Sequence, residues 1–253
     1  MSQDTAQKLE KILKKLNTGE DPAKVKAEAH ELLGALSAKD LSIAEQKLVD
    51  AGLDPEELRD LCAVHLEMLG DQLANLKAKL PPGHVVHTMM REHDYILEFL
   101  DELDVINKKV QEMGTFDPDC DEWERLRHIA DHLVEAEPHH QREEDVLFPK
   151  LEEKGVTGPP RIMRMEHVDL RHHKHELQEL SRDVGNMEFD RFKEDLKRVA
   201  NFLVFHLRDH IFKENNILYP TAVEMIQDES VWETLHKEAD KIGYCCFTPH
   251  KAP

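Results

Sequence analysis

Histidine and glutamate recur at a fixed spacing in the second part of the chain. Residues 139–149 and 210–220 both read His-x-x-x-Glu, two polar residues, a β-branched residue, leucine, an aromatic residue and proline. A Glu-His pair stands 46 residues before the first copy and 43 residues before the second: Glu92-His93 and Glu166-His167. This internal repeat indicates a duplicated helical hairpin.

The residue types in the repeat suit metal binding. A histidine and a glutamate four residues apart lie on one face of a helix, one turn from each other. In an antiparallel hairpin the N-terminal end of one helix neighbours the C-terminal end of the next, so the two copies bring their side chains to one level. Imidazole nitrogens and carboxylate oxygens fit a pair of transition metals, which carboxylates can bridge. The predicted ligands are His93, His139, Glu143, His167, His210 and Glu214.

Other histidines extend this set. The chain has 17 histidines, and 15 of them lie from His84 onward. His206 precedes His210 by four residues and shares its helix face, and His87 lies on the same predicted helix as His93. We include both as candidate ligands, and rank His132, seven residues before His139, below them. A single His-x-x-x-Glu pair is usually an ordinary surface pair, so the duplication carries the metal prediction.

Long helices must position these residues. Periodic apolar residues, with glycine and proline at the ends, predict helices over residues 84–113, 120–153, 159–185 and 189–219, and a shorter one around Trp232 and Leu235. Pro138 lies inside the second of these and is expected to kink it. No run of alternating β-branched residues predicts a strand. The fold class is all-α, with a C-terminal antiparallel four-helix bundle.

The N-terminal part reads as a separate helical bundle. Capping and proline signals, such as Asp21-Pro22 and Asp54-Pro55, predict about four helices within residues 1–80. Pro81-Pro82-Gly83 then interrupts the helical pattern. We therefore expect a small N-terminal helical domain over residues 1–80 and the metal-binding bundle with its C-terminal tail over residues 81–253.

Composition restricts the partners. The formal net charge of −19 disfavours nucleic acid and anionic lipid, and no apolar run is long enough for membrane insertion. Four scattered cysteines do not form a disulfide framework, and the first residues lack a secretory signal, so a cytoplasmic location is expected. Adjacent Cys245 and Cys246 fit either redox chemistry or packing.

At these motifs the chain resembles the hemerythrin-like, or HHE cation-binding, family. The resemblance implies a di-iron centre, so two iron ions are the expected cofactors, although zinc or manganese also match the ligand types. Residues 214–220 resemble a segment of the di-iron proteins of iron–sulfur cluster repair. Residues 61–65 and 82–88 resemble an uncharacterised domain often fused in front of such bundles.

One position departs from the pattern of the oxygen carriers. Some hemerythrins have a second histidine four residues after the ligand of the third helix, and here Arg171 occupies that position. The departure implies either an open coordination position or a substitute ligand.

Several functions fit this sequence. The main expectation is a non-haem di-iron protein that binds a small diatomic ligand, O₂ or NO, or that handles or senses iron. A di-iron redox enzyme or an iron–sulfur cluster repair factor is an alternative, and so is an interaction module with a structural metal. The residues leave enzyme status open and identify no protein partner for residues 1–80.

Overall fold

The computed structural model describes residues 77 and 79–249, so the helices predicted within residues 1–76 lie outside the described residues. The described residues contain helices and no strand, as the sequence predicts. They fall into two compact units. The first includes residues 147–163 and 213–234, and the second includes residues 82–146, 164–212 and the chain from Leu235. The proposed domain limits at residues 80 and 81 stay a prediction.

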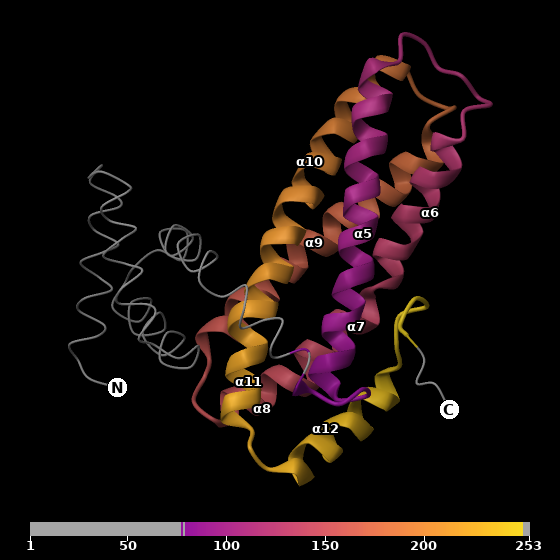
Figure 1. The fold of residues 1–253 in the computed structure, drawn as a ribbon. Coiled ribbons are helices and arrows are strands. Elements are labelled where there is room, and N and C mark those ends of the chain that lie inside the picture. Colours follow the sequence, from indigo (N-terminus) through magenta and orange to yellow (C-terminus); the bar gives the residue numbers. More distant parts are fainter. Residues whose placement is uncertain (1–76, 78, 250–253) are drawn as a thin grey trace, which may run out of the picture. The chain divides into compact units, whose positions relative to one another are not determined.

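The second unit is a four-helix bundle. Its long helices are α5 (Val85–Glu112), α6 (Glu122–Glu135), α9 (Gly158–Asp183) and α10 (Phe189–Lys213), of which α9 and α10 belong to this unit from Arg164 and up to Phe212. In Figure 1 these four helices run side by side. All four contribute fully buried apolar side chains to one core, among them Leu100, Leu126, Leu177 and Leu203.

The helix predicted over residues 120–153 is divided. It consists of α6, α7 (Glu137–Arg142), the π-helix η1 (Glu143–Leu147) and α8 (Phe148–Glu153). The break lies at Ala136, where the amide of His139 donates to the Ala136 carbonyl at 3.0 Å. Pro138, which has no amide hydrogen, stands in the first turn of α7, where no donor is required.

The helix predicted over residues 189–219 changes its winding in the same way. It consists of α10, the π-helix η2 (Glu214–Leu218) and α11 (Tyr219–Met225). A proline follows the start of each π-helix by six residues: Pro149 and Pro220. Proline cannot donate to the carbonyl four residues earlier, and its ring crowds that carbonyl, so a wider turn relieves the conflict. The Leu-aromatic-Pro endings therefore shape the helices.

The first unit includes α8, η2, α11 and the start of α12 (Glu229–Ile242). Its buried residues include Leu151, Tyr219 and Trp232. The indole Nε1 of Trp232 donates to the carbonyl of Ile226 at 2.7 Å, which fixes the turn between α11 and α12. The short last helix predicted around Trp232 is thus confirmed as α12.

The C-terminal tail, residues 243–249, begins with a change of direction at Gly243. Gly243 has φ +95°, a left-handed conformation that side-chain-bearing residues rarely adopt, and its amide donates to Ala239 at the end of α12. The tail belongs to the second unit. Over residues 77 and 79–249, no helix combines the length and the apolar character needed to cross a membrane.

Candidate metal centre

Two histidines from the first copy of the repeat face each other inside the bundle. His93 on α5 and His139 on α7 are each 1% exposed, and their Nε2 atoms lie 3.0 Å apart. On its other side, Nδ1 of His139 lies 2.7 Å from a carboxylate oxygen of Glu92. The Glu-His pair of the sequence therefore supplies one of the facing imidazoles and the carboxylate that orients the other.

The carboxylate of Glu92 is fully buried and firmly held. Arg142 Nη2 donates to both of its oxygens at 2.7 Å, and the hydroxyl of Thr248 in the tail also donates to it. Burial by itself would raise the pKa of Glu92, but the bonds and charges of His139 and Arg142 lower it to about 2. Glu92 is therefore ionised at neutral pH.

The second copy of the repeat has the same arrangement. Nε2 of His167 on α9 and Nε2 of His210 on α10 lie 2.9 Å apart, and both rings are buried. Nδ1 of His210 lies 2.7 Å from Glu166, the residue before His167. Nδ1 of His167 lies 2.7 Å from Glu144.

Glu143 lies next to both histidine pairs. Its Oε2 atom is 3.6 Å from Nε2 of His139 and 3.5 Å from Nε2 of His167, and its side chain is fully buried. Glu143, His167 and His210 each offer a ligand atom to one metal-capable group. Glu214, the corresponding residue of the second copy, is buried and begins η2, in the first unit.

The hydrogen bonds of the imidazoles restrict what can lie between them. An ionised carboxylate only accepts hydrogen bonds, so Nδ1 of His139, His167 and His210 must carry the hydrogen. In the neutral imidazole, Nε2 then presents a lone pair. At 2.9 Å the facing Nε2 atoms of His167 and His210 then need either a shared proton or a metal ion between them.

The distances also fit a transition metal. Imidazole nitrogens bind such ions at roughly 2.1 Å, so two ligands at a right angle lie about 3.0 Å apart. The two pairs lie 3.0 Å and 2.9 Å apart. A carboxylate behind the Nδ1 atom of a ligating histidine is the usual outer partner in metal sites. The residues present therefore fit the predicted metal centre.

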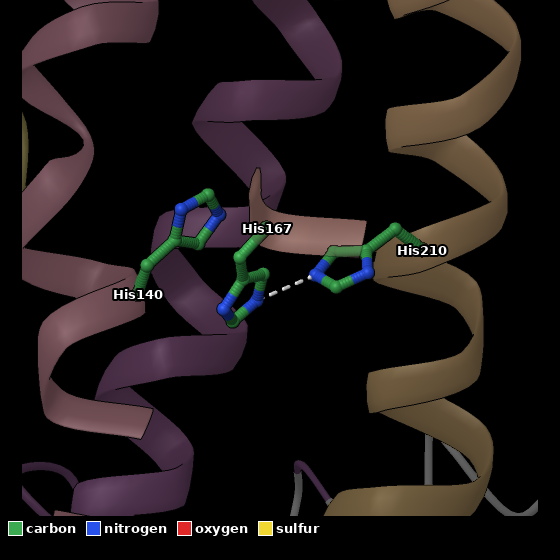
Figure 2. A group of neighbouring side chains, drawn as sticks. All are labelled: His140, His167 and His210. Carbon is green, nitrogen blue, oxygen red and sulfur yellow. Dashed lines mark hydrogen bonds between the residues drawn. The ribbon is translucent and has the colours of Figure 1, made fainter. Parts of the chain in front are cut away.

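His140 is a fifth buried imidazole that sequence reasoning did not select. Its ring stacks on His167 with centroids 4.0 Å apart, and Figure 2 shows it turned toward His167 and His210. These three histidines form another metal-capable group. Burial, together with the charges of His167 and the buried Lys174, lowers the pKa of His140. The His139-His140 dipeptide was the only signal for it.

His87 and His206 lie outside the metal-capable groups found among residues 77 and 79–249. Both are half-buried, and the ring of His206 contacts Phe202 and Phe205 on its own helix. Their assignment as ligands stays a prediction.

Arg171, at the position of the missing histidine, binds carboxylates. Its guanidinium donates to Glu137 at 2.9 Å and to Glu144 at 3.0 Å. Burial would raise the pKa of Glu144, but its bonds to His167 and Arg171 lower it to about 2. Arg171 therefore keeps ionised the carboxylate that orients His167.

Comparisons with known proteins place the chain in a family. The family model described as the hemerythrin HHE cation binding domain matches residues 84–222, and a family of unknown function, DUF438, matches residues 9–75. The chain is similar to the proteins called iron-sulfur cluster repair protein YtfE from Salmonella typhimurium and Salmonella schwarzengrund. Each is 25% identical over 173 residues, which cover 63% of this chain and 78% of the relative.

Proposed function

Because the chain belongs to the hemerythrin HHE cation-binding family, whose domains bind a di-iron centre, we propose that its two iron ions bind a small diatomic ligand, O₂ or NO. The proposal takes the repeated residues as iron ligands. They are His93, His139, Glu143, His167, His210 and Glu214. The assignment of Glu143 and Glu214 as bridging carboxylates is part of the proposal.

One observation carries the proposal. Within each of two pairs, the imidazoles face each other with their Nε2 atoms 2.9–3.0 Å apart. One oxygen of Glu143 lies 3.5–3.6 Å from a member of each pair. A carboxylate placed between two nitrogen-rich positions can bridge two cations and reduce their mutual repulsion. A mononuclear structural site would not need this duplication.

The protein residues have two tasks at this centre. Glu92, Glu144 and Glu166 hold the Nδ1 hydrogens, which fixes the tautomer and directs Nε2 inward. The imidazoles are buried among the helices, which exclude bulk water from them. Ferrous iron, when bound, supplies the electrons for binding O₂ or NO.

The ligand count leaves room for a diatomic molecule. The proposed set has four imidazoles and two carboxylates for two ions, which is fewer than two six-coordinate ions accept. Arg171 stands where a further histidine would reduce that room, and its guanidinium is bound to Glu137 and Glu144.

Spectroscopy on the full chain tests this function. After anaerobic loading with ferrous iron, elemental analysis is expected to find about two iron ions per chain. Absorption spectra recorded before and after adding O₂, and separately NO, should show a new charge-transfer band. A metal that stays tightly bound and spectroscopically unchanged by both gases would contradict the proposal and favour the interaction module with a structural metal.

Delivery of iron for cluster repair is the second candidate function. The YtfE relatives carry that role in their name. The two halves of the centre differ in exposure, because the Glu166 side chain is 28% exposed whereas Glu92 is fully buried. Iron near His210 would therefore exchange more easily than iron near His139.

A transfer assay separates the two functions. The iron-loaded chain is mixed anaerobically with an iron-depleted iron–sulfur protein and a sulfide source, and cluster formation is followed by absorption. Transfer faster than from an equal amount of free ferrous iron supports repair. No transfer, together with a spectral response to O₂ or NO, supports ligand binding alone.

A further inference from the structure

A second group of possible metal ligands includes two exposed residues and none of the facing histidines. His132 and Glu135 on α6 and Cys246 in the C-terminal tail each offer a ligand atom, and these atoms lie within 4.8 Å of one another. The thiol of Cys246 donates to Glu135 Oε2 at 3.1 Å. His132 and Glu135 are three residues apart, so they share a helix face.

The tail holds Cys246 in place from both sides. Before it, Cys245 is buried, with its sulfur 3.9 Å from Arg142 Nη2. After it, the ring of Phe247 packs against Phe99, with centroids 5.4 Å apart. The hydroxyl of Thr248 then binds Glu92 inside the bundle. The three-residue site is therefore formed before any ion binds.

The tautomer of His132 leaves one nitrogen available. Nδ1 of His132 lies 2.8 Å from the carbonyl oxygen of His128, and a carbonyl only accepts hydrogen bonds. Nδ1 must therefore carry the hydrogen, so Nε2 of the neutral ring has a lone pair. The ring itself is positioned by contacts with Phe99 and Phe247, at centroid distances of 5.1 Å and 6.2 Å.

We propose that His132, Glu135 and Cys246 form a second metal site, which binds a divalent ion of the zinc class. A thiolate, an imidazole and a carboxylate together are a typical donor set for such an ion. Tetrahedral ligands at roughly 2.0–2.3 Å from zinc are about 3.3–3.8 Å apart, so the 3.1 Å between sulfur and carboxylate needs only a small adjustment.

An ion bound at this site can exchange with the solvent. Three protein ligands leave one tetrahedral position for water, and both Glu135 and Cys246 are exposed. An incoming ligand or chelator can therefore reach the ion directly. The proposal uses none of the residues assigned to the di-iron centre, so each assignment can fail without the other.

Zinc absorption spectroscopy on the iron-loaded full chain tests the site. One equivalent of Zn²⁺ is added with a phosphine reductant, and the zinc-edge spectrum is expected to show one sulfur at about 2.3 Å with nitrogen and oxygen neighbours. Cys246→Ser should remove the sulfur signal. His132→Ala should weaken zinc binding at least tenfold in equilibrium dialysis.

Two control variants remove a cysteine and a histidine that lie outside the proposed site. Cys120→Ser removes another thiol that donates to a glutamate, and His175→Ala removes an exposed histidine of α9, so neither should alter zinc binding. The proposal is overturned if the zinc spectrum contains no sulfur, or if the sulfur signal persists in Cys246→Ser. It is equally overturned if zinc is taken up only as iron is lost.

Discussion

Glu143 is the residue next to both histidine pairs, and its charge should decide metal content. Glu143→Gln keeps the shape of the side chain but removes the negative charge beside His139 and His167. Two dications would then share a buried site with less compensating charge. We expect the variant to hold fewer than two iron ions per chain by elemental analysis.

Glu98→Gln, on an exposed part of α5, provides the control and should keep the wild-type iron content. Full iron content in Glu143→Gln would refute the bridging role.

Glu92 and Glu166 occupy equivalent positions in the two copies, but their environments differ. Glu92→Gln leaves the buried guanidinium of Arg142 without its carboxylate, which should cost about 3–5 kcal/mol of unfolding free energy. Glu166→Gln removes a part-exposed carboxylate, so it should cost much less stability. Both should weaken metal binding roughly 10–100-fold, because each carboxylate orients a ligand histidine.

Urea unfolding of the metal-free variants, with separate metal titrations, measures these two effects. Equal losses of stability would contradict the asymmetry.

The ligand pattern could be predicted because it lies in short-range spacing along the sequence. The contacts of the surrounding residues could not, because they join residues far apart in the sequence. The repeat identified His93, His139, His167 and His210, which the structure brings together in two pairs. It also contained Glu92 and Glu166, but a dipeptide does not reveal which imidazole a carboxylate orients. Thr248 reaches Glu92 across 156 residues, and no local pattern encodes that contact.

At the level of elements, the π-helices should support the metal centre. Pro149→Ala restores an amide hydrogen and removes the ring that crowds the preceding turn, so the segment around η1 can return to α-helical winding. Glu143 and Glu144 lie at the start of η1, so their positions would change. We expect weaker iron binding, while the melting temperature of the metal-free protein does not fall.

The exposed loop variant Pro118→Ala should leave both quantities unchanged. Wild-type iron affinity in Pro149→Ala would contradict a role of Pro149 in positioning the metal ligands.

The start of α5 should make stability sensitive to acid. His84 caps this helix by accepting from the amide of Val86, and burial with the nearby His87 and His236 lowers its pKa to about 4. The unfolded chain, with a histidine pKa of about 6.5, then binds the proton first as pH falls. The contribution of His84 to the unfolding free energy is therefore fully present above pH 6.5 and is lost as pH falls from about 6.5 to 4.

His84→Asn keeps a capping acceptor without this titration. Its melting temperature should fall less than that of the wild type between pH 7 and 4.5, with both proteins metal-free. Identical pH profiles would exclude His84 as a source of acid sensitivity.

Element positions followed the sequence closely, because capping residues, glycine and proline act locally. The prediction of a helix over residues 84–113 matches α5 within one residue at each end. The π-turns were not predicted, since apolar periodicity in a short window does not separate a single wide turn from an α-helix. The helices expected within residues 1–76 stay predictions.

For the molecule as a whole, removing iron should lower stability. Ions that bind only the folded chain add RT ln(1 + [L]/Kd), about 2.7 kcal/mol when free iron is a hundred times Kd. The metal-free centre also contains His140, whose pKa is lowered by burial and by the charges of His167 and Lys174. Because metal-bound imidazoles cannot take up protons, acid weakens iron binding, so the melting temperature of the loaded chain should fall toward that of the metal-free chain below pH 6.5.

Calorimetry of both forms between pH 5 and 8 measures the difference. A difference in melting temperature between the two forms that stays constant from pH 8 to pH 5 would contradict iron ligation by histidine.

The duplication affects how the chain can misfold. The hairpins α5–α7 and α9–α10 each contain one facing histidine pair, so each hairpin can take the place of its counterpart in a second molecule. During refolding at high concentration, two chains can exchange hairpins and complete two mixed bundles. Such a domain-swapped dimer would retain the iron content per chain and would differ from the monomer only in size.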